Sequence, residues 1–169
     1  MKQTIQQKIV KEIIKEQKTK PDVIAINVFG SVAKGEERPD SDVDIAIIST
    51  KYKKWRLIKQ KRYGIDIDFE IWSKDKLLER IKKYPYLSYN FLKEKTVYDP
   101  KSFMNKITNK LKEYFRKHPE VVKFWEQKYK LMKKNKKKGI DPKEALKTYN
   151  EAEIKFSKKH KITRDWFRG

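Results

Sequence analysis

The sequence contains no cysteine and only two histidines, His118 and His160. A disulfide framework and a thiolate metal site are therefore excluded, and two histidines so far apart do not indicate a zinc site. Any bound metal would be held by oxygen atoms. No apolar run approaches the roughly 18 residues of a membrane helix, and an amphipathic pattern, not a signal-peptide core, follows the basic N-terminus. We expect a cytoplasmic protein with no membrane partner.

Negative charge is also scarce. Lysine and arginine number 44 against 23 aspartate and glutamate residues, which gives a formal net charge of +21. Residues 101–169 carry +14 of this charge and the first hundred residues carry +7. Such a chain attracts polyanions such as nucleic acid. A lysine-rich composition that merely solvates helix faces explains the charge equally well, so charge alone does not identify a partner.

The first hundred residues alternate between helical and strand-like patterns. Apolar residues at helical spacing predict helices, and β-branched or strictly alternating runs predict strands. The predicted segments are a helix over residues 3–17, strands over 22–29, 42–49 and 65–72, and a helix over 73–83. Residues 1–100 therefore form the first predicted domain, of the α+β class.

After residue 100 the pattern becomes wholly helical. Ser102 opens one helix with an apolar stripe, and a second helix ends at Gly139. Asp141 followed by Pro142 is typical of an N-cap with proline at the first helical position, which predicts a third helix through about residue 158. The second predicted domain is thus a basic helical C-terminal region over residues 101–169.

Acidic side chains gather on the faces of two predicted strands. Asp42 and Asp44 share one strand face at about 6.6 Å from each other, and Asp66, Asp68 and Glu70 share a face of the next strand. Like charges at this range repel by about a few kcal/mol, so the cluster indicates a bound cation. Oxygen ligands of this kind suit Mg²⁺ or Mn²⁺.

A glycine and a serine stand at the end of the first predicted strand. Gly30 lets the backbone approach a phosphate closely, and Ser31 offers both its hydroxyl and its N–H group. Carboxylate-held metals facing such a phosphate cradle are typical of two-metal phosphoryl or nucleotidyl transfer. The pattern therefore favours a nucleotide substrate.

The segment FGSVAKGEERPDSDVDIAII, residues 29–48, resembles the signature of the DNA polymerase beta nucleotidyltransferase superfamily. It is most similar to the minimal nucleotidyltransferases, and the resemblance extends over residues 22–99. It implies an α+β fold with a small mixed β-sheet and flanking helices. It also implies that Asp42 and Asp44 bind two metals, that Gly30 and Ser31 hold the triphosphate of an NTP, and that a third acid binds the catalytic metal.

The third acid has two candidates. In family members the phrase similar to DFEIWSKDKL usually begins with the third aspartate, which implies Asp68, and Asp66 is the alternative. Lys34 and Arg38 lie beside the signature and are candidates to contact the triphosphate, although a solvated loop explains them equally well. Trp55 lies among seven basic residues within residues 51–62, a segment that either binds nucleic acid or forms an exposed loop.

Two classes of function remain open. The first is a nucleotidyltransferase that moves a nucleoside monophosphate from an NTP to an acceptor hydroxyl, and the resemblance admits three acceptors. These are an RNA end such as that of tRNA, a protein partner of the toxin-antitoxin type, and a small drug of the aminoglycoside type. The second class is a non-catalytic module that binds nucleic acid or a partner. Retention of mutually repelling acids favours the enzyme.

Overall fold

The structure is a computed structural model, and it describes residues 3–140, 154–156 and 158–159. The chain divides into two compact units, Met1–Arg116 and Lys117–Gly169. We describe each unit by itself. The division into domains at residue 100 stays a prediction, because the compactness of a segment does not show that it folds alone.

A mixed five-stranded sheet forms the centre of the first unit, and its strand order is β3-β4-β2-β1-β5. The strands are β1 (Val23–Phe29), β2 (Val43–Ser49), β3 (Arg56–Arg62), β4 (Ile65–Ser73) and β5 (Lys95–Tyr98). β2 and β4 are parallel, and the other pairs are antiparallel. The predicted α+β fold with a small mixed sheet is therefore confirmed.

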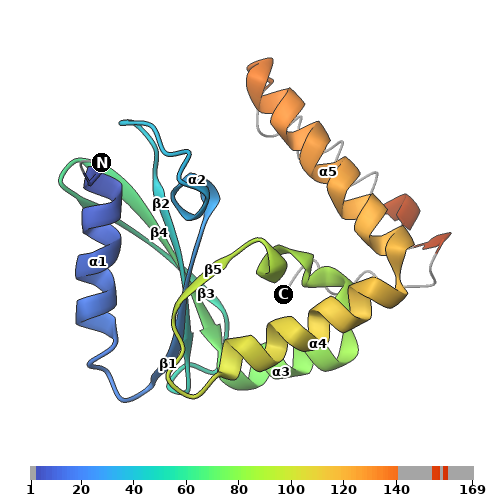
Figure 1. Cartoon of the computed structure of the whole chain (residues 1–169), viewed down its shortest axis with the longest axis horizontal. Coiled ribbons are helices and arrows are strands. Elements are labelled where there is room, and N and C mark those ends of the chain that lie inside the picture. Colours follow the sequence, from blue (N-terminus) through green and yellow to red (C-terminus); the bar gives the residue numbers. More distant parts are fainter. Residues whose placement is uncertain (1–2, 141–153, 157, 160–169) are drawn as a thin grey trace. The chain divides into compact units, whose positions relative to one another are not determined.

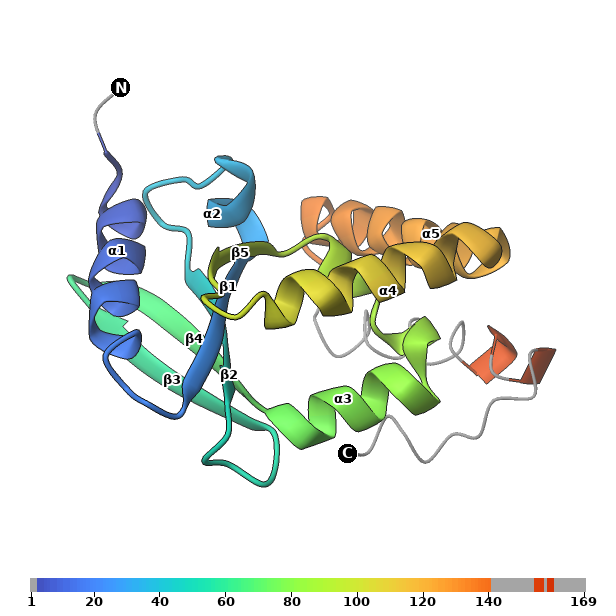
Figure 2. The same ribbon diagram turned by 60° about the horizontal axis from the view of Figure 1, so that its bottom comes forward.

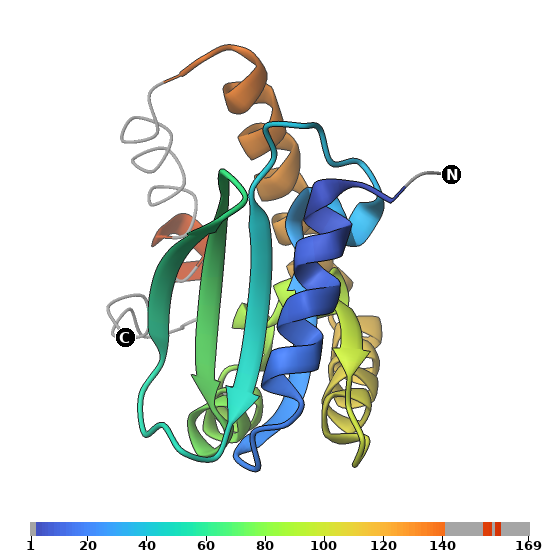
Figure 3. The ribbon, with the colours of Figure 1, turned by 90° about the vertical axis from the view of Figure 1, so that its left-hand side faces the viewer.

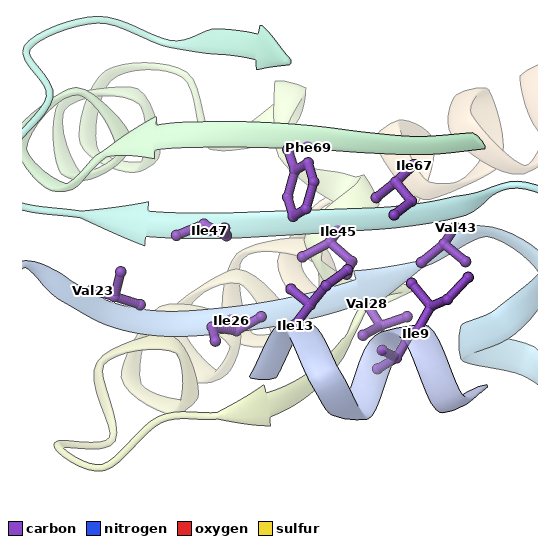
Figure 4. Close-up of a cluster of buried hydrophobic side chains, with 11 residues drawn as sticks. Ile9, Ile13, Val23, Ile26, Val28, Val43, Ile45, Ile47, Ile67 and Phe69 are labelled. Atoms are coloured by element: carbon purple, nitrogen blue, oxygen red, sulfur yellow. The ribbon is translucent and has the colours of Figure 1, made fainter. Parts of the chain in front are cut away.

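Helix α1 (Ile5–Gln17) covers one face of the sheet (Figure 3). Thr4 caps it by accepting a hydrogen bond from the Gln7 N–H group. Ile9 and Ile13 are fully buried and point toward the sheet (Figure 4). The strand residues of this core alternate along β2 and β4, so the remaining residues of those strands face the other side.

The opposite face is covered by α3 (Lys74–Lys83) and α4 (Phe103–Lys117), which lie across the sheet from α1 (Figures 1 and 2). Two short 3₁₀ turns, η1 (Pro85–Leu87) and η2 (Tyr89–Leu92), join α3 to β5. Ser73 caps α3 as predicted, accepting from the Lys76 N–H group. A second core of buried side chains results: Ala25, Ile48, Leu77, Phe91, Met104, Ile107 and Leu111.

Several elements differ from the sequence-based expectation. Residues 51–62, which the sequence left open between an RNA-binding segment and a loop, end in strand β3, and the four-residue β5 was not predicted at all. The second strand begins at Val43, so Asp42 lies one residue before it. Residues Gly30–Lys34 form the short helix α2 at the Gly-Ser turn, where a serine at the start of a short helix was expected.

In the second unit, helix α5 (Pro119–Lys137) confirms the second predicted C-terminal helix. Its Phe124 ring stacks on Phe156 with ring centroids 4.1 Å apart. The third predicted helix, residues 141–158, falls mostly outside the described residues, as does the unassigned C-terminal end. Across the part of the chain that is described, no helix has the length and apolarity needed to cross a membrane.

Candidate active site

Asp44 and Asp68 are direct neighbours on the sheet. The parallel register of β2 and β4 pairs these two residues, and both lie on the face opposite α1. Adjacent strands are about 4.8 Å apart, so the two carboxylates lie close together. Both side chains are half-buried and keep partial access to solvent. The side chain of Asp68 is 28% exposed. This pairing brings together two of the three acids proposed as metal ligands.

Asp42 lies two residues before Asp44 and is exposed. No three His, Cys, Asp or Glu side chains gather into a metal-binding group among the residues that the structure describes. The backbone order still places Asp42, Asp44 and Asp68 at one corner of the sheet. Their joint role as metal ligands therefore stays a prediction.

The loop before Asp42 is fixed by a residue that the sequence reasoning missed. Gln6 of α1 is 1% exposed, and its side-chain amide donates to the carbonyl oxygens of Arg38, Pro39 and Ser41 at 2.8, 3.2 and 3.2 Å. A buried amide that binds three carbonyls holds the loop against the helix. Its only signal in the sequence is a polar residue beside the apolar stripe of α1.

Gly30 is packed against the carboxylate of Asp44. Phe29, the last residue of β1, pairs with Asp44, so the chain turns into α2 directly over this acid. Gly30 has a φ of +69°, which favours glycine, and a Cβ at this position would collide with Oδ2 of Asp44. Only a residue without a side chain allows this close approach.

Ser31 is the second residue of helix α2, and the adjoining Val32 and Ala33 pack against the core beneath α1. Its hydroxyl oxygen is buried, and the described residues provide it with no hydrogen-bond partner. A buried hydroxyl without a partner is unfavourable, so a bound group that offers it an acceptor atom would be stabilised there. A phosphate oxygen beside the acids of Asp44 and Asp68 would satisfy it, and such a donor set fits a divalent cation with a bound triphosphate.

The two proposed phosphate-binding cations are both exposed. Lys34 is the last residue of α2. Arg38 pairs with Asp40, with Nε and Oδ1 3.2 Å apart, so its guanidinium is engaged within its own loop. Contacts of Lys34 and Arg38 with a triphosphate stay a prediction.

Lys59 of β3 forms an ion pair with Asp68, with Nζ and Oδ2 3.2 Å apart. The register explains the pair, because Lys59 lies directly opposite Asp68 and Lys61 lies opposite Asp66. Lys61 in turn pairs with Asp66 at 3.2 Å. Asp66 lies further from Asp44 than Asp68 does, which supports Asp68 as the third acid. The sequence reasoning missed Lys59 because β3 was not predicted.

We expect Lys59→Gln to tighten Mn²⁺ binding to the nucleotide-free protein. The ammonium group competes with a metal for Asp68, and an exposed ion pair of this kind is worth about 0.2 to 1 kcal/mol. The dissociation constant should therefore fall by about 1.4-fold to fivefold. Isothermal titration calorimetry measures the change. Lys61→Gln is the matched control, and a larger gain there than at Lys59 would favour Asp66 as the metal ligand.

Below the acids the same sheet face carries a second polar group. The register places Glu70 beside Ala46, and Ala46 beside Asn27. Burial raises the pKa of Glu70, while hydrogen bonds from the indoles of Trp72 and Trp55 oppose the shift. Glu94 accepts hydrogen bonds from Asn27 at 2.8 Å and from Asn90 at 3.0 Å. Burial, followed by the charge of Glu70, raises its pKa to about 7.

Glu94 makes the stability of the protein depend on pH. Its pKa rises from an ordinary value of 4.5 to about 7, so between these values the folded state keeps a proton that the unfolded chain releases. The contribution of Glu94 to stability is therefore greatest below pH 4.5 and falls by about 3 kcal/mol as the pH rises through 7. We expect Glu94→Gln to reduce this loss between pH 5 and pH 8.

Urea denaturation of the wild type and of Glu94→Gln at both pH values provides the measurement. Glu36→Gln removes the same charge from an exposed side chain and is the control. An equal fall of the midpoint in wild type and Glu94→Gln would assign the pH dependence to another group.

A cavity of about 230 Å³ lies on the other face of the sheet. Its lining includes Phe69, Ile71, Glu16 and Asp22. Phe69 belongs to the core beneath α1, so this cavity faces away from Asp44 and Asp68. The cavity is therefore separate from the candidate site around Asp44 and Asp68.

Comparison with known proteins agrees with the geometry. The family model described as "Polymerase beta, Nucleotidyltransferase" matches residues 11–103. Among solved structures, the chain is similar to a nucleotidyltransferase-like protein from Exiguobacterium sibiricum 255-15, with 12% identity and a TM-score of 0.47. The similar region covers 62% of this chain and 38% of that one. No curated protein matches the sequence.

Proposed function

Since this chain belongs to the polymerase beta nucleotidyltransferase family, we propose that it transfers a nucleoside monophosphate from an NTP to an acceptor hydroxyl with the help of Mg²⁺ or Mn²⁺. One observation carries the proposal. Asp44 and Asp68 are neighbours across β2 and β4, directly beside the close approach of Gly30. Two neighbouring carboxylates next to a glycine turn suit the binding of a cation with a phosphate ligand.

Each residue at this corner has a role in the proposal. Asp42, Asp44 and Asp68 would hold the divalent ions, and Gly30 and Ser31 would hold the triphosphate. Such ions stabilise the negative charge of the attacking and leaving oxygens when bound. The buried Ser31 hydroxyl then gains a phosphate oxygen as its acceptor. Gly30 keeps Asp44 and the phosphates close by presenting no side chain between them.

The reaction itself is a displacement at the α-phosphorus. The acceptor oxygen forms a bond to this atom, the bond to the bridging oxygen breaks, and pyrophosphate leaves with the electron pair. The acceptor hydroxyl loses its proton to a water molecule. The chain contributes the position of the phosphates and a cluster of negative charge that concentrates divalent cations.

The acceptor is an RNA end or a protein partner of the toxin-antitoxin type, and RNA is the acceptor that we favour. Residues 51–62 contain seven basic residues and no acidic residue. This segment includes β3, which pairs with the strand that carries Asp68. A small drug of the aminoglycoside type is cationic and would be repelled by this segment. The net charge of +14 in residues 101–169 attracts polyanions as well.

Incubation with each α-labelled NTP and Mg²⁺, with and without total RNA, tests the proposed function. We expect label to enter an RNA product only when the divalent ion is present. Label on a co-purified protein would identify the other acceptor. If no triphosphate labels any product, the chain is a binding module that retains the family fold without its activity.

A further inference from the structure

The edge strand β3 and the residue before it present a row of four side chains on the same face as Asp68. Leu57, Lys59 and Lys61 lie opposite Glu70, Asp68 and Asp66, so they share the face of these acids. Trp55 directly precedes the strand and contacts Trp72 edge to face, with ring centroids 6.4 Å apart. Residues two apart in a strand are about 6.6 Å from each other, so the row is regular.

The composition of this row is unusual for a solvated sheet edge. The side chains of Lys59 and Lys61 are 72% and 62% exposed. Trp55 is 47% exposed and Leu57 is 45% exposed, although both are large and apolar. Exposed apolar groups in line with cations are typical of a surface that binds a ligand with both planar and anionic parts.

Trp55 is also held in place. Its ring packs edge to face on Trp72, whose indole donates a hydrogen bond to Glu70 at 3.1 Å. Trp72 in turn packs edge to face on the buried Phe91 with centroids 5.5 Å apart. An exposed ring that is ordered before binding loses little conformational entropy when a ligand stacks on it. Trp55 is therefore a preformed platform.

The order of the strands defines where an acceptor would approach. Gly30 follows β1 and lies on one side of Asp44, whereas Asp68 lies on the other side, in β4. The next strand beyond Asp68 is β3. The row on β3 therefore lies on the side of Asp68 that is away from the phosphate cradle, where an acceptor oxygen has room to approach.

We propose that Trp55, Leu57, Lys59 and Lys61 form the binding surface for a single-stranded RNA acceptor, an inference that rests on the proposed function. A base stacks on Trp55, and backbone phosphates bind Lys59 and Lys61. A duplex hides its bases and cannot use Trp55. The side chains on the opposite face of β3 make contacts within the fold. Arg62 pairs with Glu12 and Glu16 of α1, and Ile58 packs against the core.

Fluorescence anisotropy of the full chain with a short labelled oligoadenylate, without NTP and in EDTA, tests the surface. Trp55→Ala should weaken binding by about tenfold, the loss expected for one stacked base. Lys59→Gln with Lys61→Gln should reduce the slope of log K against log salt by about 1.4, since each phosphate contact on a single strand contributes about 0.7. The matched control is Arg56→Gln, which removes a charge from the other face of β3.

The inference is overturned if Trp55→Ala binds as tightly as the wild type, or if Arg56→Gln reduces the salt slope by about 0.7, the amount expected for each of the two lysines. Equal binding of duplex and single-stranded RNA also overturns it, as does transfer to a protein without any measurable RNA binding. Because the assay contains no metal or NTP, it reports RNA binding whether or not the chain transfers nucleotides. RNA binding by a wild-type chain that labels no product with any NTP would thus reject the proposed function and leave this surface in place.

Discussion

Asp44→Asn is expected to reduce nucleotidyl transfer by at least about a thousandfold. Asp44 is the central acid of the site, because it lies between Asp68 of β4 and Phe29 of β1. Gly30, the residue after Phe29, packs against its carboxylate. An amide has the same shape but no charge, so it removes a metal ligand without removing bulk. Losses of a single charge-stabilising group already reach about a hundredfold to a thousandfold. Initial rates of label transfer at saturating Mg²⁺ provide the measurement.

The matched controls for Asp44→Asn are the corresponding changes at the two candidate third acids. Asp68→Asn should reduce the rate by a comparable factor, whereas Asp66→Asn should change it by less than about threefold, as expected for an exposed ion pair of small energy. Circular dichroism should show that all three variants keep the fold. A large loss at Asp66 with a small loss at Asp68 would exchange their assignments, and full activity of Asp44→Asn would reject the metal site.

The acid faces of β2 and β4 could be predicted from the sequence because they depend on a local pattern. Alternation of apolar and acidic residues puts the carboxylates of each strand on one side, and the register then brings Asp44 to Asp68. The family signature identified Gly30 and Ser31 in the same way, from residues close in the chain.

Strand β3 could not be predicted, since its apolar residues Leu57 and Ile58 are adjacent and its other residues are polar. The strand is specified by its partner, because Lys59 and Lys61 lie opposite Asp68 and Asp66 of β4. Cross-strand ion pairs of this kind stabilise a strand whose own sequence has a weak preference for one. The charge pattern of β3 therefore predicts a strand only when it is compared with the charge pattern of its partner β4.

The role of Gln6 was hidden for a related reason. A glutamine next to an apolar stripe is ordinary on a helix surface, and the three carbonyl oxygens that it binds come from a loop more than thirty residues away. The collision between a Cβ at Gly30 and Asp44 is also a contact between distant residues. Such contacts depend on tertiary packing, which residue patterns along the chain do not contain.

Gly30→Ala is expected to reduce both stability and transfer. The φ of +69° costs an alanine about 1 to 2 kcal/mol, and its Cβ must push away the carboxylate of Asp44 or shift the turn into α2. Either movement separates Asp44 from the proposed phosphate site, and a displacement of about 1 Å at a reacting centre costs on the order of a hundredfold in rate. Thermal unfolding and label transfer measure the two effects.

Gly35→Ala separates the backbone strain from the contact with Asp44. Gly35 ends α2 with a φ of +68°, but a Cβ there meets nothing within 4 Å. This variant should therefore lose a similar amount of stability from its backbone conformation and keep nearly all of its transfer rate, because Asp44 does not move. If Gly30→Ala and Gly35→Ala lowered the rate equally, the close approach of Gly30 to Asp44 would have no part in positioning the nucleotide.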